Sequence, residues 1–138
     1  MEYAVVIIIL LIVAFMWARV DDKKREAQID KIFEGRDSLE PEEFYEKYYG
    51  STDISKAIVV DILVILETVL EIELSRLLPS DDFSQNLRYL FEFDSMADVD
   101  LVESLERKFL IKISDIEAEN IKTIEDLVMF VSNKVNCT

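Results

Sequence analysis

Residues 94–109 read DSMADVDLVESLERKF, and their spacing predicts an amphipathic helix. Apolar side chains recur along it at helical intervals, interrupted by Glu106: Val99, Val102, Leu105 and Phe109. Asp94 and Ser95 are both residue types that cap helix N-termini, so the helix is predicted to begin there. A serine hydroxyl at the start of a helix is exposed and reachable.

Two further helix starts follow Phe109. Ser114 and Asp115 offer a cap before a short helical turn at residues 118–121. Thr123 offers the next cap, and the apolar residues behind it share one helical face: Ile124, Leu127, Val128 and Val131. The chain from residue 94 to residue 131 is therefore predicted to form a helix, a short helical turn and a second helix.

In order and without a gap, these segments resemble helices II, III and IV of an acyl carrier protein. The resemblance rests on Asp94-Ser95-Met96, on the helix ending in Glu-Arg-Lys-Phe, and on the segments Ile-Lys-Ile-Ser-Asp, Ala-Glu-Asn-Ile and Thr-Ile-Glu-Asp-Leu-Val. It implies that Ser95 carries a covalent 4′-phosphopantetheine arm, attached from coenzyme A by a phosphopantetheinyl transferase. A helix start suits this chemistry, because backbone N–H groups there stabilise the phosphodiester anion.

The resemblance also implies an acidic surface that docks on partner proteins. The motif and docking residues are Asp94, Met96, Asp98, Asp100, Glu103 and Glu106. The partners implied are acyl-transferring or acyl-activating enzymes with basic docking patches, as in fatty acid or polyketide biosynthesis. One departure lies just before the motif, where the family usually has Leu-Gly and this chain has Phe91-Glu92-Phe93.

Composition limits the other possibilities. The chain has 138 residues with only two glycines and two prolines, which favours an all-α fold. Its net charge of −14 argues against nucleic-acid binding, since a phosphate backbone would be repelled. It contains no histidine and one cysteine, Cys137, so neither an internal disulfide nor a histidine metal site is expected.

An apolar run from Ala4 to Ala18 predicts a single transmembrane helix. Extended from Tyr3 to Val20, such a helix is roughly 27 Å long, against a hydrocarbon core of about 30 Å. A buried core helix is the alternative interpretation. All basic residues follow the run, so the positive-inside rule places the N-terminus outside and the C-terminal domain in the cytoplasm. The predicted location is the cytoplasmic membrane, crossed once.

The predicted architecture is a transmembrane anchor (1–20), a juxtamembrane helical spacer (21–50) and an acyl-carrier-like four-helix bundle (51–138). Within the spacer, a helix at 39–49 capped by Ser38 has an aromatic face that is expected to pack on the bundle: Phe44, Tyr45, Tyr48 and Tyr49. A strongly apolar helix at 54–72, capped by Ser51 or Thr52, corresponds in place to helix I of the family. Its wide apolar stripe predicts burial on two sides.

The leading hypothesis is a membrane-tethered carrier that presents acyl groups as thioesters on the arm at Ser95. The alternative is an unmodified carrier-like adaptor that binds basic partners through its acidic helix, with Ser95 acting only as an N-cap. An enzyme acting through its own residues is least favoured, because the chain has no Gly-rich phosphate loop, no Cys/His cluster and no nucleophile elbow.

Overall fold

The computed structural model describes residues 2–92 and 96–136, and these are mostly helical, as predicted. The chain divides into two compact units, residues 1–35 and residues 36–138. The first unit contains helix α1 (Glu2–Ile32). The second contains α2 (Pro41–Tyr49), α3 (Lys56–Leu70), α4 (Arg88–Phe91), α5 (Ala97–Phe109), α6 (Asp115–Asn120) and α7 (Ile124–Asn136).

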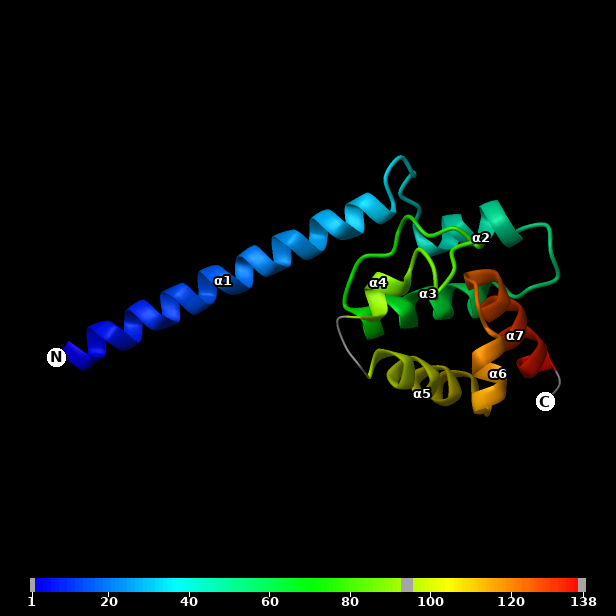
Figure 1. Ribbon diagram of the computed structural model, residues 1–138. Coiled ribbons are helices and arrows are strands. Elements are labelled where there is room, and N and C mark those ends of the chain that lie inside the picture. The colour runs from blue at the N-terminus through cyan, green and yellow to red at the C-terminus, as the bar shows by residue number, and fades with distance from the viewer. Residues whose placement is uncertain (1, 93–95, 137–138) are drawn as a thin grey trace. The chain divides into compact units, whose positions relative to one another are not determined.

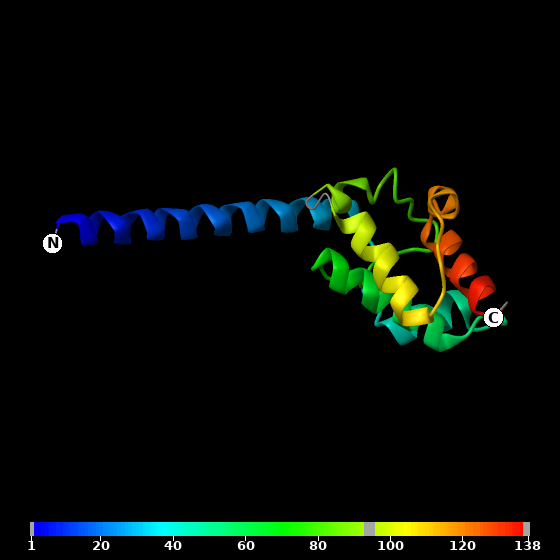
Figure 2. The same cartoon turned by 90° about the horizontal axis from the view of Figure 1, so that it is seen from below.

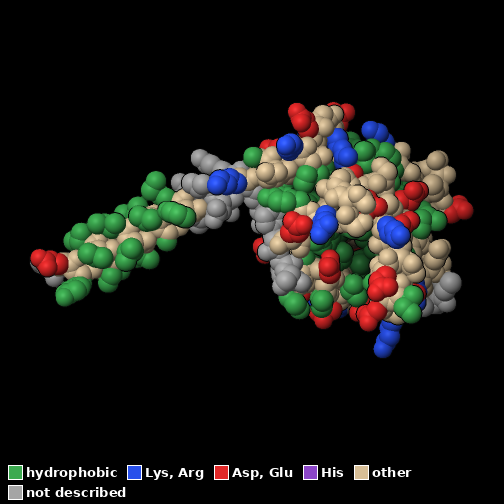
Figure 3. Space-filling model, in the orientation of Figure 1, with side chains coloured by type: hydrophobic (Ala, Val, Ile, Leu, Met, Phe, Trp, Pro, Cys, Tyr) green, Lys and Arg blue, Asp and Glu red, His purple; other side chains and the backbone are tan. Residues whose placement is uncertain are grey.

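The first half of α1 exposes apolar side chains to solvent, as Figure 3 shows along its length. No helix among the described residues is long and apolar enough to cross a membrane. The predicted transmembrane helix at residues 4–18 is therefore wrong, and so is the single-pass membrane location with an outside N-terminus. The physical reason is length: the 15 apolar residues rise about 22 Å, and α1 then continues into charged sequence.

Helix α3 is the centre of the second unit, and α2, α5 and α7 each pack against it (Figure 1, Figure 2). Its buried side chains point to more than one partner, as the wide apolar stripe predicted: Ile58, Val59, Ile62, Leu63, Leu66 and Leu70. From α2, Phe44 and Tyr49 are buried, which confirms that the aromatic face packs inward. At the surface between α3 and α5, Asp61 Oδ2 of α3 lies 4.0 Å from Lys108 Nζ of α5.

The last helix follows the sequence prediction closely. Its four predicted apolar positions, Ile124, Leu127, Val128 and Val131, are all buried. The Thr123 hydroxyl accepts a hydrogen bond from the Asp126 N–H at 3.0 Å, so Thr123 caps α7 as expected. Local chemistry and tertiary packing agree in this helix.

The predicted N-caps of helices α2 and α3 were wrong. Helix α3 begins after Ser55, because the Thr52 hydroxyl donates to the Tyr49 carbonyl at 2.6 Å and so closes the turn after α2. Helix α2 begins after Glu40 rather than Ser38, with Pro41 in its first turn and the Glu40 N–H donating to the Glu43 carboxylate at 3.4 Å. In both cases several polar residues precede the helix, and only tertiary structure selects among them.

Candidate functional site

The predicted modification site lies immediately before α5. Asp94 and Ser95 fall outside the described residues, and the description resumes at Met96, the N-cap residue of α5. Met96 is 52% exposed, and its carbonyl accepts a hydrogen bond from the Asp100 N–H at 2.9 Å. Since Ser95 is bonded to Met96, any group attached to Ser95 must be held near this end of α5.

The buried face of α5 differs from the predicted one. Ala97, Leu101 and Leu105, four residues apart, form the face that packs inward, whereas Val99 is 44% exposed. Phe109, the last residue of the predicted apolar face, is only half-buried. The sequence pattern allowed both faces, because valine and leucine residues occupy both sides of this helix. As a result, Met96 and Val99 leave apolar surface exposed near the start of α5.

The acidic residues of α5 separate into three settings. Asp100 and Glu103 are exposed and lie three residues apart, so they share one side of the helix. Asp98 is also exposed, but it borders the cavity described below. Glu106 is half-buried, and its carboxylate accepts a hydrogen bond from the Ile113 N–H at 3.0 Å. Glu106 therefore stabilises the loop after α5, and its carboxylate is less available to a partner protein than those of Asp100 and Glu103.

A cavity of about 570 Å³ opens beside the first turns of α5, bounded also by α4, α6 and α7. Most of its lining side chains are apolar: Phe83, Phe91, Leu101, Val102, Leu105, Ile113, Ala118, Ile121 and Leu127. Figure 3 shows a hollow on this face with hydrophobic side chains deep inside it and charged ones around it. This cavity cannot be predicted from local sequence, because its walls come from segments far apart along the chain.

One wall of the cavity combines an aromatic contact with an ion pair. Phe83 and Phe91 meet edge to face with ring centroids 5.6 Å apart, an arrangement that favours a fixed position for both rings. At the rim, Arg88 Nε lies 3.4 Å from Glu92 Oε1, but both side chains are exposed and the pair contributes little stability. Glu92, which replaces the glycine usual in the resembled family, is thus a rim residue.

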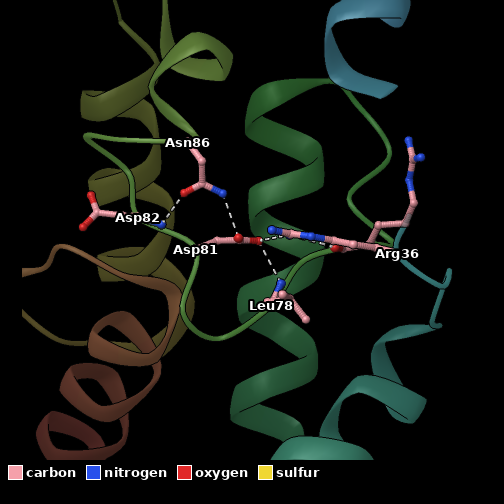
Figure 4. A network of polar contacts seen from close by, with 6 residues as sticks. Arg36, Leu78, Asp81, Asp82 and Asn86 are labelled. Carbon is pink, nitrogen blue, oxygen red and sulfur yellow. Dashed lines mark hydrogen bonds and ion pairs between the residues drawn. The ribbon is translucent and has the colours of Figure 1, made fainter. Parts of the chain in front are cut away.

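The loop between α3 and α4 is organised by a buried carboxylate that the sequence analysis missed. Asp81 is only 2% exposed, and its carboxylate accepts hydrogen bonds from the Leu78 N–H and from Asn86 Nδ2, both at 2.8 Å (Figure 4). The side-chain Oδ1 of Asn86 in turn accepts from the Asp82 N–H at 2.8 Å. These bonds fold the loop so that Phe83 and Ser84 line the cavity.

Asp82 completes the turn in this wall. The Ser84 hydroxyl donates to the Asp82 carboxylate at 2.7 Å and the Ser84 N–H at 2.8 Å. The Ser84 hydroxyl bond, followed by the Ser84 N–H bond, lowers the pKa of Asp82 below its usual value. The lowered pKa means that Asp82 remains an ionised acceptor for Ser84 to more acidic pH than an ordinary aspartate would.

The short helix α6 forms the opposite side of the cavity. Its cap at Ser114 was predicted, but the helix begins at Asp115 rather than at residue 118. The Ser114 hydroxyl accepts from the Glu117 N–H, and the Glu117 carboxylate accepts from the Ser114 N–H, both at 3.1 Å. Lys134 Nζ of α7 lies 2.9 Å from Glu117 Oε2, and this contact is the main cause that lowers the pKa of Glu117. The cap stabilises the start of α6, and the ion pair joins α6 to α7.

Comparisons with known proteins agree on one family. Residues 60–131 match the family model described as "Phosphopantetheine attachment site". The chain is 35% identical over 80 residues to an acyl carrier protein of Thermosynechococcus vestitus, covering 58% of this chain and 85% of that protein. It is 39% identical over 62 residues to an acyl carrier protein of Helicobacter hepaticus, covering 45% of this chain and 76% of that protein. A third acyl carrier protein, from Cyanidium caldarium, is 44% identical over 43 residues, or 31% of this chain and 50% of its own length.

Proposed function

The chain belongs to the acyl carrier protein family, and on this basis we propose that it presents acyl groups as thioesters on a 4′-phosphopantetheine arm attached to Ser95. The protein is a carrier rather than an enzyme, and its cofactor is a covalently attached 4′-phosphopantetheine. Attachment at Ser95 is our assignment. It is supported by the match of Asp94-Ser95-Met96 to the family motif, inside the matched residues 60–131.

The observation that carries this proposal is the apolar cavity at the start of α5. Met96 follows Ser95 directly, and the cavity is lined by side chains from the first turns of the same helix, Asp98, Leu101 and Val102. A hollow of about 570 Å³ with mainly apolar walls suits a flexible hydrocarbon chain. The residues present therefore fit a serine-linked arm whose acyl group folds back against the protein.

The bound cofactor supplies a thiol that holds the acyl group as a thioester. The chain's own residues have two tasks around it. Backbone N–H groups in the first turn of α5 would stabilise the phosphodiester anion, with the positive end of the helix dipole behind them. Leu101, Val102 and Leu105 would shield an acyl chain from water, since burying its methylene groups is favourable by about 0.8 kcal/mol each.

Membership of the family implies a phosphopantetheinyl transferase and acyl-handling enzymes as partners. For this chain we propose that Asp100 and Glu103 attract basic partner surfaces, while Met96 and Val99 supply apolar contact between them. All four side chains are exposed. Glu106 contributes less, because its carboxylate already binds the Ile113 N–H.

The attachment can be tested by incubating the full chain with coenzyme A and a phosphopantetheinyl transferase, followed by mass spectrometry of the modified peptide. The wild-type chain is expected to gain one phosphopantetheine on the peptide that contains Ser95. Ser95→Ala should gain none, whereas the matched control Ser104→Ala, on the same helix, should be modified like wild type. A modified Ser95→Ala chain, or an unmodified wild-type chain, contradicts the assignment.

A further inference from the structure

A segment outside the family-matched residues reaches into the loop that forms the cavity wall. Arg36 Nη1 lies 2.8 Å from Asp81 Oδ2 and also donates to the Arg76 carbonyl at 3.3 Å (Figure 4). Nearby, the Leu39 N–H donates to the Ser75 carbonyl at 2.7 Å. Residues 36–39, which we term the strap, are therefore bonded to the α3–α4 loop at more than one point.

The partner of Arg36 is the buried carboxylate that organises the loop. Leu78 and Asn86 donate to this carboxylate as neutral groups, whereas Arg36 brings a full positive charge. A buried carboxylate is costly unless its charge is compensated, and removing one member of a buried ion pair leaves the other uncompensated. Without Arg36, the Asp81 carboxylate loses the positive charge that compensates it, and the loop held by its hydrogen bonds is expected to open more often.

Opening at Asp81 would disturb the cavity, because the next residues form its wall. Phe83 and Ser84 line the cavity, and the Phe83 N–H donates to the Lys122 carbonyl at 2.8 Å. The Asp81 carbonyl accepts from the Ile124 N–H at 3.0 Å, which joins the same loop to the start of α7. Asp81 thus connects the strap, the wall and α7.

We propose that Arg36 is a positioning residue for the cavity: by neutralising and holding Asp81, it fixes the wall at Phe83 and Ser84 and so determines how well a bound acyl chain is shielded from water. This role rests on the proposed carrier function, because shielding matters only if an acyl group is present. Arg36 acts through Asp81 and does not itself line the cavity. The strap would then be an addition to the carrier fold that tightens its acyl pocket.

The wall can be tested first in the unmodified full chain by amide hydrogen exchange. In Arg36→Gln, the amides of Phe83 and Leu87 should exchange at least about 10-fold faster than in wild type, since a hydrogen bond to a charged partner is lost. Amides of α3 are the internal reference and should be unchanged. Arg107→Gln, a substitution of the same type at an exposed position of α5, should leave the wall amides unchanged.

If Arg36→Gln exchanges faster everywhere, its fold is too weak to be informative and Arg36→Lys decides. Lysine keeps the charge but lacks the planar fork of donors, so the wall amides alone should exchange a few-fold faster. Unchanged exchange at Phe83 and Leu87 in both variants would overturn the proposal.

The second measurement addresses shielding. Wild-type and variant chains are loaded with acetyl- or octanoyl-phosphopantetheine, and the rate of thioester cleavage by hydroxylamine is compared. Arg36→Gln should raise the octanoyl rate several-fold while leaving the acetyl rate unchanged, because only the longer chain reaches the cavity. Arg36→Lys should restore most of the protection. If amide exchange is faster in Arg36→Gln but the octanoyl rate is unchanged, the positioning role is refuted. If the wild-type chain cannot be loaded at all, the carrier function is contradicted. Amide exchange then still decides whether Arg36 holds the wall.

Discussion

Helices α5 and α7 are both 13 residues long and both pack on α3, yet they are built differently. Helix α7 is capped by Thr123, and its predicted apolar face is fully buried. Helix α5 has Met96 at its N-cap position, where a thioether is only a weak acceptor, and it leaves Met96 and Val99 exposed. Exposed acidic side chains in the first turn are common to both helices, Asp98 and Asp100 in α5 and Glu125 and Asp126 in α7, so the contrast lies in the cap and in the exposed apolar residues at the start of α5.

We infer from this difference that α7 mainly stabilises the fold, whereas the start of α5 is left open to a ligand. A helix start already bonded by its own side chains offers few N–H groups to a ligand, whereas α5 begins with the exposed Met96, two residues before Asp98 of the cavity lining. Access has a cost, because exposed apolar and acidic side chains contribute little to folding.

The largest difference should come from truncating one apolar side chain in each helix. Ile124→Ala in α7 should lower the free energy of unfolding by about 2–5 kcal/mol, because Ile124 is fully buried. Val99→Ala in α5 should change it by less than about 0.5 kcal/mol, since the side chain is half in solvent. Chemical denaturation measures both free energies of unfolding. Similar losses in the two variants would show that the exposed side of α5 contributes as much stability as the buried face of α7.

A buried tyrosine next to the start of α7 should make stability fall at alkaline pH. Burial, followed by the negative charge of Glu125, raises the pKa of Tyr49 from 10.0 to about 12. The folded state therefore holds this proton more tightly than the unfolded state does. The resulting stability is complete below pH 10 and is lost as pH rises from about 10 to about 12, by roughly 1.4 kcal/mol for each pKa unit.

Tyr49→Phe supplies the control for this effect. Within the described residues the Tyr49 hydroxyl has no hydrogen-bond partner, so the substitution should cost little at neutral pH. The wild-type chain should lose stability relative to Tyr49→Phe between pH 10 and pH 12. Parallel pH profiles for the two chains would mean that Tyr49 ionises as it does in water.

The helix starts should respond unequally to loss of their N-cap side chains. Thr123→Ala should destabilise the fold by about 0.5–2 kcal/mol, because it removes the hydroxyl that accepts from the Asp126 N–H. Met96→Ala should change stability by no more than about 0.5 kcal/mol. An equal loss at Met96, measured in the same denaturation series, would show that α5 also depends on its cap residue.

The smallest effect on stability is expected for the exposed acids of α5. The double substitution Asp100→Asn and Glu103→Gln should leave the free energy of unfolding within about 0.5 kcal/mol of wild type. It should nevertheless slow modification by a phosphopantetheinyl transferase several-fold at low salt, with the difference shrinking as salt is added. The double substitution Glu42→Gln and Glu46→Gln on α2, which also removes two exposed negative charges, is the control, and an equal slowing there would assign the effect to net charge alone.

The parts of this fold that could be predicted are those specified by local sequence. Ser114 and Thr123 lie directly before their helices, and the apolar positions of α7 have one consistent spacing, so caps and buried face were both correct. The buried face of α5 was misjudged, because apolar residues such as Val99 and Leu101 lie on opposite sides of it. Asp81 and the cavity could not be predicted, since their contacts join segments distant in sequence. The apolar run at the start of α1 has the composition of a membrane span, but its 15 residues reach a spanning length only when charged and polar neighbours are counted with them.

If the exposed start of α5 serves a covalent arm on Ser95, the arm should be present on the protein in its native host. The intact mass of the full chain purified from that host can be compared with the mass of Ser95→Ala expressed in the same host. We expect the wild-type mass to be increased by one phosphopantetheine, with or without an acyl group, and the Ser95→Ala chain to be folded and unmodified. A wholly unmodified wild-type chain, together with a Ser95→Ala variant that retains function in the cell, would rule out the carrier function and favour an adaptor that acts through its acidic helix alone.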